Sequence, residues 1–202
     1  MANTKSVDLG PRQRLLEVAA KLFADRGLDG TSVRDIAKES GLNLSLVSYY
    51  FGGKEGLYLE LIRSFALNIA TELERVILLF EGEEPSSGTI KKFLSALVEA
   101  YSEIRSSHPQ IGKILQRERV AGLPHACDIY EKTFAPVAEA LVQQIVKAKK
   151  KGFVRKDINP LLIVIFLQES IIGFHNLMEC PLQMTQSPLV KTKNFKDFQN
   201  QL

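Results

Sequence analysis

Apolar residues recur every three or four positions along almost the whole chain. No stretch alternates apolar and polar residues long enough to predict a strand. In the first such segment, Leu15, Leu22 and Phe23 form one apolar stripe. Pro11 is a favoured residue of a first helical turn, and Gly27 is typical of a left-handed helix cap. The pattern therefore predicts a first helix between Pro11 and Gly27.

Two short helices are predicted next. One begins around Thr31 and Ser32 and is ended by Gly41, and the other takes Asn43 as its N-cap and ends near Phe51. Two short helices that are separated by a glycine turn and packed on a preceding helix make a helix-turn-helix.

The remaining pattern predicts longer helices. A long helix runs from about Lys54 to Phe80, followed by a loop at 81–88 whose composition is polar. Further helices are expected at 88–106, 109–122, 126–150 and 160–178, and a loosely packed polar tail at 181–202. The predicted fold class is all-α, with an N-terminal three-helix domain over 1–57 and a C-terminal helical domain over 58–202.

Composition places the chain among soluble globular proteins. Hydrophobic residues make up 45% and charged residues 24%, with a formal net charge of +3. The two cysteines form no disulfide framework, and the N-terminus lacks the apolar core of a secretory signal. The longest apolar run, 161–167, is too short to span a bilayer. We expect a soluble, cytoplasmic protein without a membrane segment.

Catalytic signatures are absent from the sequence. The three histidines, His108, His125 and His175, have no metal-ligand spacing, and neither a phosphate-binding loop nor a nucleophile elbow occurs. Glu118, between Arg117 and Arg119, is interpreted as part of surface or interhelical ion pairs. We expect no catalytic residue, no metal site and no cofactor.

The segment LLEVAAKLFADRGLDGTSVRDIAKESGLNLSLVSYYFGGKEGLYLELI (15–62) resembles the N-terminal signature of the TetR family of bacterial regulators nearly end to end. The match consists of many residue types at fixed spacing. They are Gly27, Thr31, Ser32, Ile36, Ala37, Gly41, Tyr50, Phe51, Lys54, Glu55 and Leu57.

This resemblance implies a role for each part of the helix-turn-helix. Helix 31–39 would lie across the DNA backbone, with the hydroxyls of Thr31 and Ser32 donating to phosphate. Helix 43–50 would enter the major groove as the recognition helix. The residues expected to contact DNA are Thr31, Ser32, Arg34, Asn43, Leu44, Ser45, Leu46, Ser48, Tyr49, Tyr50 and Lys54. Val47 and Phe51 are expected in the core.

The recognition helix has no Arg or Lys before Lys54, so bidentate reading of guanine is excluded there. Contacts with thymine methyls, hydroxyl hydrogen bonds and DNA shape are expected instead. The resemblance implies that Tyr50 contacts phosphate or packs at the hinge, and it leaves open which of Tyr49 and Tyr50 touches phosphate. Residues 1–57 hold eight basic and seven acidic side chains, so charge adds little, and Arg34 is either a phosphate contact or part of a solvated face.

For the C-terminal domain, the resemblance implies effector binding and dimerisation. Helices 133–150 and 160–178 would pair with their copies in a second subunit, and the latter is apolar on nearly all sides. A homodimer would present two recognition helices to a palindromic operator in double-stranded DNA. The alternative for helix 160–178 is the core of a monomer.

A small, largely hydrophobic effector is expected, and its binding would be read out by movement of helix 54–80. The candidate effector-binding residues are Phe93, Leu97, Tyr101, Leu115, Arg119, Tyr130 and Phe134. The alternative is that these side chains simply fill the core. The effector would either release or promote DNA binding, and release of a repressor is the commoner behaviour of the family.

Two rival functions remain at this point. One is a helical small-molecule binding protein without DNA binding, which the small charge excess permits. The other is an all-helical enzyme that uses the C-terminal domain.

Overall fold

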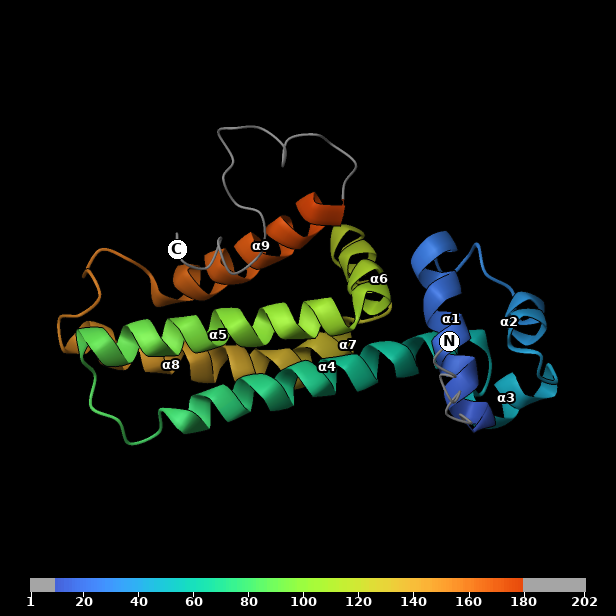
Figure 1. Ribbon diagram of the computed structural model, residues 1–202, viewed down its shortest axis with the longest axis horizontal. Helices are drawn as coiled ribbons and strands as arrows, with labels where there is room; N and C mark the ends of the chain where they lie inside the picture. Colours follow the sequence, from blue (N-terminus) through green and yellow to red (C-terminus); the bar gives the residue numbers. More distant parts are fainter. Residues whose placement is uncertain (1–9, 180–202) are drawn as a thin grey trace, which may run out of the picture. The chain divides into compact units, whose positions relative to one another are not determined.

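The computed structural model describes residues 10–179, and every regular element in this range is a helix (Figure 1). The expected all-α fold is therefore confirmed. The predicted tail at 181–202 lies outside the described residues. The helices are α1 (Pro11–Arg26), α2 (Val33–Ser40), α3 (Ser45–Phe51), α4 (Lys54–Leu79), α5 (Ser87–Ser107), α6 (Pro109–Val120), α7 (Cys127–Ile129), the π-helix η1 (Tyr130–Phe134), α8 (Ala135–Lys150) and α9 (Pro160–Glu179).

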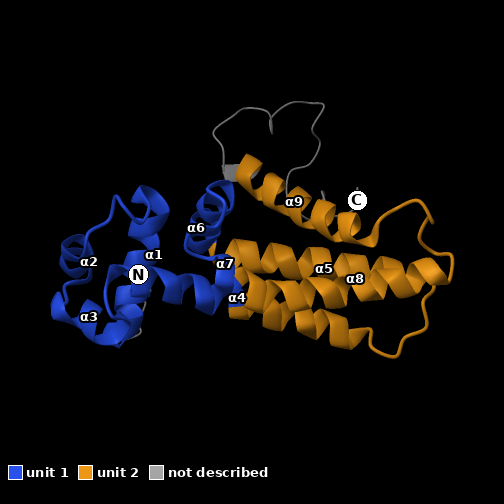
Figure 2. Cartoon of the chain, turned by 180° about the vertical axis from the view of Figure 1, so that it is seen from behind, with its two compact units in different colours: residues 1–66, 109–129 blue, residues 67–108, 130–202 orange. Residues whose placement is uncertain are grey.

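The chain divides into two compact units (Figure 2). The first unit combines residues 1–66 with 109–129, so it contains α6 and α7 as well as α1 to α3. The second unit combines 67–108 with 130–202. Helix α4 is continuous across the boundary between residues 66 and 67.

The core of the first unit is built from the apolar stripes of its short helices. Leu15 and Phe23 of α1, Ile36 of α2, Val47 of α3 and Ile62 of α4 are all fully buried. Helix α1 packs against α2, α3 and α6. Burying one such side chain contributes about 1.5–3 kcal/mol, so this small core holds the short helices α2 and α3 in place.

The core of the second unit lies between four helices. Leu73 of α4, Leu97 of α5, Leu141 of α8 and Val164 of α9 belong to one buried cluster. Helix α9 packs against both α5 and α8. This bundle is the helical C-terminal part that the sequence pattern predicts.

The helix predicted at 126–150 is present from residue 127 to 150, as three consecutive segments: α7, the π-helix η1 and α8. Pro136 lies in the first turn of α8 and explains the π-helical turn before it. A proline ring collides with the carbonyl four residues earlier, and it removes one backbone donor. The wider π-helical turn over 130–134 accommodates it before regular α-helix resumes. The predicted helix is therefore present from residue 127 onwards, and the π-helical turn is the feature that the apolar spacing did not predict.

Helix α9 leaves an apolar face exposed. Leu161 and Leu162 are each 44% exposed, Ile165 is 41% and Phe166 is 65%. The window Pro160–Leu177 has a mean hydropathy of 1.5, so this one helix is long and apolar enough to cross a membrane by length and composition alone. The uninterrupted apolar run at 161–167 is shorter than this window, because polar residues follow it. Those polar residues lower the mean hydropathy of the window only a little.

Candidate nucleic-acid interface

Helix α2 starts with a complete capping box. The Ser32 hydroxyl accepts a hydrogen bond from the Asp35 backbone N–H (3.1 Å), and the Asp35 carboxylate accepts one from the Ser32 backbone N–H (2.9 Å). These bonds satisfy two donors that a helix start leaves free. The hydrogen bonds from Ser32, first from its side chain and then from its backbone, lower the pKa of Asp35.

Thr31 does not have the role that the sequence analysis gave it. Its side chain is buried, and its hydroxyl donates to the carbonyls of Gly27 (2.8 Å) and Leu22 (3.3 Å). Its backbone N–H donates to the Leu28 carbonyl (3.3 Å). Thr31 therefore ties the start of α2 to the end of α1. The expected donation from its hydroxyl to phosphate is corrected, because the hydroxyl points inward. Ser32 is exposed.

The turn between α2 and α3 depends on glycine. Gly41 caps α2 with φ of +65°, a left-handed conformation that other residues adopt only with strain. Helix α3 begins at Ser45 with Leu44 as its cap, so the predicted N-cap at Asn43 is one residue early. The Asn43 amide oxygen nevertheless accepts the Ser45 backbone N–H (2.9 Å) and holds the turn.

Helix α3 buries one side and exposes the other. Val47 is fully buried, whereas Tyr49 is 78% exposed and Leu44 is 44% exposed. Ser45 and Ser48 are exposed as well, and Leu46 is half-buried. The exposed side of this short helix thus presents hydroxyls and apolar groups, with no basic side chain among them.

Tyr49 and Tyr50, near the end of α3, differ in how far their side chains are exposed. The rings of Tyr49 and Tyr50 meet edge to face with centroids 4.9 Å apart, and Tyr50 is the less exposed, at 36%. Phe51, expected in the core, is half-buried under the Arg12 guanidinium, which lies 5.2 Å from its ring centre. Tyr49 therefore offers the more accessible phenol on this surface.

Two basic residues lie in or next to the two short helices, Arg34 in α2 and Lys54 after α3. Arg34 of α2 is exposed. Lys54, the first residue of α4, is half-buried, and its ammonium donates to the Leu28 carbonyl (2.9 Å). An ammonium group carries three donors, so two remain for an external anion.

Gly56 permits the close junction of α3 and α4. A Cβ at this position would lie 1.8 Å from the Phe51 carbonyl oxygen, far inside any real contact. Only glycine allows the first turn of α4 to pass this closely under the end of α3. This role was not recognised in the sequence, because Gly56 lies inside a helical pattern.

Helix α6 supplies a contact to α1 that the sequence analysis missed. The Arg117 guanidinium donates to the carbonyls of Phe23 (2.9 Å) and Asp25 (3.1 Å), which lie in the last turn of α1. A cation at a helix C-terminus also interacts favourably with the helix dipole. The interpretation of Glu118 as part of ion pairs gave no indication that Arg117 contacts backbone carbonyls.

Glu118 of α6 carries a buried carboxylate that contacts α4. It is 4% exposed and accepts hydrogen bonds from the Tyr58 hydroxyl (2.7 Å), the His125 ring (3.0 Å) and the His125 backbone N–H (3.1 Å). Burial raises the pKa of Glu118, but these hydrogen bonds outweigh burial and leave it below its ordinary value. Burial and the bond to Glu118 raise the pKa of Tyr58.

The seven candidate effector-binding residues are divided between the two units. Leu115 and Arg119 belong to the first unit, and the other five belong to the second. Phe93 and Leu97 are buried in the core of the second unit, and Tyr101 packs against it. The rings of Tyr130 and Phe134 are 4.7 Å apart. Burial raises the pKa of Tyr101 to about 12, so its phenol stays neutral at physiological pH.

Comparison with known families matches residues 15–61 to the profile described as bacterial regulatory proteins, tetR family. The chain is 27% identical over 173 residues to the HTH-type transcriptional repressor KstR2 of Rhodococcus jostii (strain RHA1). That alignment covers 84% of this chain and 80% of the relative. The chain is 32% identical over 107 residues to the probable HTH-type transcriptional regulator YttP of Bacillus subtilis (strain 168), covering 53% of this chain and 49% of the relative.

Solved structures show the same fold. The ketosteroid transcriptional regulator KstR2 of Mycobacterium tuberculosis superposes with a TM-score of 0.68 at 26% identity, covering 90% of each chain. A putative fatty acid metabolism regulator of Clostridium perfringens superposes with a TM-score of 0.70 at 19% identity, covering 93% of each chain. Both sequence relatives are named as transcription regulators and not as enzymes.

Proposed function

We propose that the chain, whose residues 15–61 match the tetR family of bacterial regulatory proteins, is a repressor of that family and binds palindromic operator DNA as a homodimer. A small, largely hydrophobic effector releases it from the operator. This proposal rests on the exposed face of α3, a helix that buried Val47 anchors to the core of the first unit. Repressors of this kind act in the cytoplasm, where their DNA is.

The contacts to DNA follow from the exposed side chains. We propose that Leu44, Leu46 and Tyr49 touch thymine methyls and sugar edges, while Ser45 and Ser48 form hydrogen bonds with bases or phosphates. Hydroxyls and apolar groups read sequence less strictly than arginine, so DNA shape contributes to specificity. The proposed phosphate contacts are the two remaining donors of Lys54, the Ser32 hydroxyl, Arg34, Asn43 and Tyr50.

Dimerisation through α8 and α9 is proposed from the exposed apolar face of α9. A helix that is apolar all round requires burial on more than one side, and a second copy supplies the missing side. The same burial accounts for the high hydropathy of α9 without a membrane. Two-fold symmetry would then place the two recognition helices about one turn of DNA apart, roughly 34 Å.

For the effector, we propose the apolar interior of the second unit near Phe93, Leu97, Tyr101, Tyr130 and Phe134. The solved relative KstR2 is described as a ketosteroid regulator, which supports an apolar ligand. Phe93 and Leu97 are closely packed, so the effector must displace them and thereby strain the bundle to which α4 belongs. Leu115 and Arg119 lie in the other unit.

The test is selection of bound sequences from a random duplex library at moderate salt, followed by affinity measurements on the recovered site. We expect a palindrome whose half-sites are one helical turn apart. Tyr49→Ala should weaken binding to it by about 1–3 kcal/mol, or roughly tenfold to a hundredfold, because one base or phosphate contact is lost. Lys91→Ala, which changes an exposed lysine of α5, is the control and should leave affinity within about twofold.

Recovery of no sequence by folded, dimeric protein would contradict operator binding. The function would then be that of a helical small-molecule binding protein. If a palindrome is recovered but the Tyr49→Ala variant keeps its affinity, the proposed contact between the exposed face of α3 and DNA is wrong.

A further inference from the structure

A groove of about 1020 Å³ lies between α4 and α5 in the second unit, apart from the candidate effector-binding residues. Buried Val76 of α4 and Ile104 of α5 lie along it. Ala96 and Ala100, one turn apart on α5, leave space where larger side chains would fill it. Ligand sites in proteins are commonly about 300–1,000 Å³ and mostly apolar, so this groove is large enough for a small organic molecule.

The groove is acidic, although the protein as a whole is basic. Its lining holds three glutamates, Glu72, Glu99 and Glu103, against one arginine, Arg75. The formal charge of the lining is therefore −2 with histidine neutral, whereas the full chain has +3. A negative groove on a positive protein selects for a cationic ligand.

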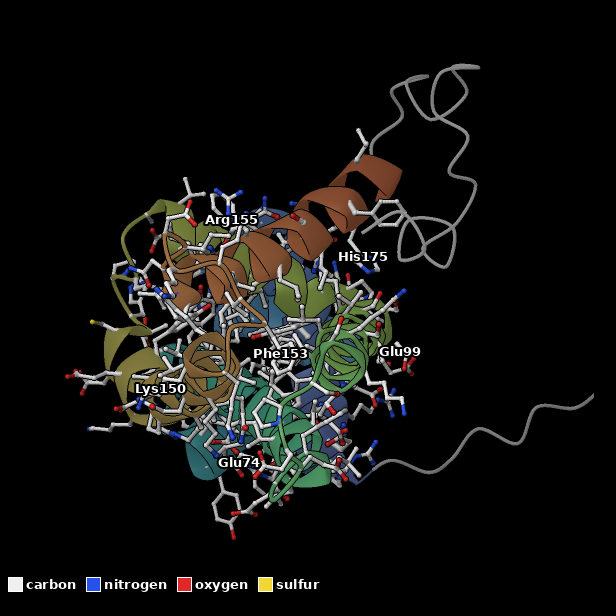
Figure 3. The ribbon with its side chains drawn as sticks, turned by 90° about the vertical axis from the view of Figure 1, so that its left-hand side faces the viewer. Glu74, Glu99, Lys150, Phe153, Arg155 and His175 are labelled. Atoms are coloured by element: carbon white, nitrogen blue, oxygen red, sulfur yellow. The ribbon has the colours of Figure 1, made fainter. Side chains whose placement is uncertain are left out.

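The carboxylates differ in how far they are engaged. Glu72 pairs with Arg75 at 3.5 Å, and Glu103 accepts a hydrogen bond from Ser107 at 3.4 Å. Glu99 has no ion-pair or hydrogen-bond partner among the described residues, and its side chain extends outward from α5 (Figure 3). Because Glu99 and Glu103 are four residues apart on a helix, their Cβ atoms are about 5–6 Å apart on one face.

We propose that this groove binds an aliphatic polyamine. Its protonated amines would donate to Glu99, Glu103 and Glu72, and its methylene segments would lie over Val76, Ala96 and Ala100. The lining contains no Phe, Tyr or Trp, so a cation–π cage for a quaternary ammonium is missing. Recognition therefore depends on N–H donors, which polyamines have and quaternary ammonium ions lack.

The first test is titration of the full chain with spermidine in the absence of DNA, followed by calorimetry and by NMR of the labelled protein. We expect saturable binding of one spermidine per chain, with shifts confined to α4 and α5. Hexamethonium has methylenes and two charges but no N–H donor, and it should bind at least about fivefold more weakly. Equal affinity for the two cations, or no saturable binding, would overturn the proposal.

Variants separate the groove from general charge attraction. Glu99→Gln combined with Glu103→Gln should weaken spermidine binding roughly fivefold or more. Glu74→Gln removes one negative charge from an exposed site of α4 outside the groove, on another side of the unit (Figure 3), and should have an effect within about twofold. An equal loss in the Glu74 variant would overturn the proposal.

Ala100→Leu fills the groove without changing its charge, and it too should weaken binding. This variant provides a second test if the double glutamine variant does not fold. Spermidine binding unchanged by Ala100→Leu would show that the groove is not the site. Because DNA is absent from every arm, failure here leaves operator binding untouched, and failure of operator binding leaves this site untouched.

Discussion

Glu118 shows how much a single buried carboxylate can hold. Its two oxygens receive three hydrogen bonds, from residues of α4 and of the segment that follows α6. Hydrogen bonds to a charged group contribute about 1.5–3 kcal/mol each, and an unsatisfied buried partner costs about as much. The carboxylate therefore stabilises the first unit as long as it stays ionised.

We predict that Glu118→Gln lowers the free energy of unfolding by about 2 kcal/mol at pH 7. A glutamine amide offers one N–H₂ group where the carboxylate had an acceptor, so a His125 donor or the Tyr58 hydroxyl loses its partner. Denaturant unfolding at pH 7 measures the change, with exposed Glu74→Gln as the control. A loss no larger than that of the control would show that the three bonds contribute nothing net.

The same residue predicts a pH dependence. The pKa of Glu118 is lower in the folded protein than its ordinary value of 4.5. The folded state therefore binds fewer protons than the unfolded state in this range, and the stabilisation is complete above about pH 5. It is lost as the pH falls through the folded pKa. Between pH 5 and pH 3 the difference in unfolding free energy between wild type and Glu118→Gln should shrink, and a constant difference would contradict this.

At the residue scale, the sequence predicted what depends on local pattern. The glycine of the turn and the buried Val47 follow from spacing and propensity, whereas the capping of α2 by Ser32 was not predicted. The orientation of Thr31 did not, because a threonine before a helix suits both an inward and an outward hydroxyl. The roles of Arg117, Glu118 and Gly56 depend on packing against other helices, which a single sequence does not display.

At the level of elements, α6 belongs with the helices of the first unit. Arg117 donates to two carbonyls of α1, and Glu118 accepts from α4, so adjacent residues hold different helices. From sequence order alone, residues 109–122 are expected in the second domain, because they follow the helices of that domain along the chain. In the structure they belong to the first unit. The π-helical turn before α8 was readable in principle, because Pro136 lies inside a helical run.

We predict that Arg117→Ala destabilises the last turn of α1, since two carbonyls lose their charged donor. The expected loss is about 1–2 kcal/mol, visible as faster hydrogen exchange of amides in that turn. Arg117→Lys is the matched variant. An ammonium keeps the charge but lacks the planar fork that reaches two acceptors, so it should recover only part of the loss. Full recovery by lysine would indicate that only the charge matters.

For the whole molecule, the proposed dimer depends on the exposed apolar face of α9. We predict that combining Ile165→Glu with Phe166→Glu weakens the dimer by at least about 3 kcal/mol, or more than a hundredfold, because apolar burial is replaced by buried charge. Sedimentation equilibrium measures the dissociation. Val120→Glu changes an 85% exposed residue of α6 and should leave the dimer intact.

The outcome for DNA follows from the symmetry of the palindrome. The monomeric variant should bind one half-site weakly and lose the affinity of the full site. A variant that stays dimeric would contradict the assignment of α9 to the interface.

The split of the first unit into 1–66 and 109–129 also has a consequence for biosynthesis. A nascent chain emerges from the ribosome from its N-terminus, so α1 to α3 appear long before Arg117 and Glu118 are translated. Until residues 117 and 118 have emerged, the last turn of α1 lacks its guanidinium cap, and Tyr58 lacks its carboxylate acceptor. The DNA-reading helices therefore reach their final support only after α5 has already been made.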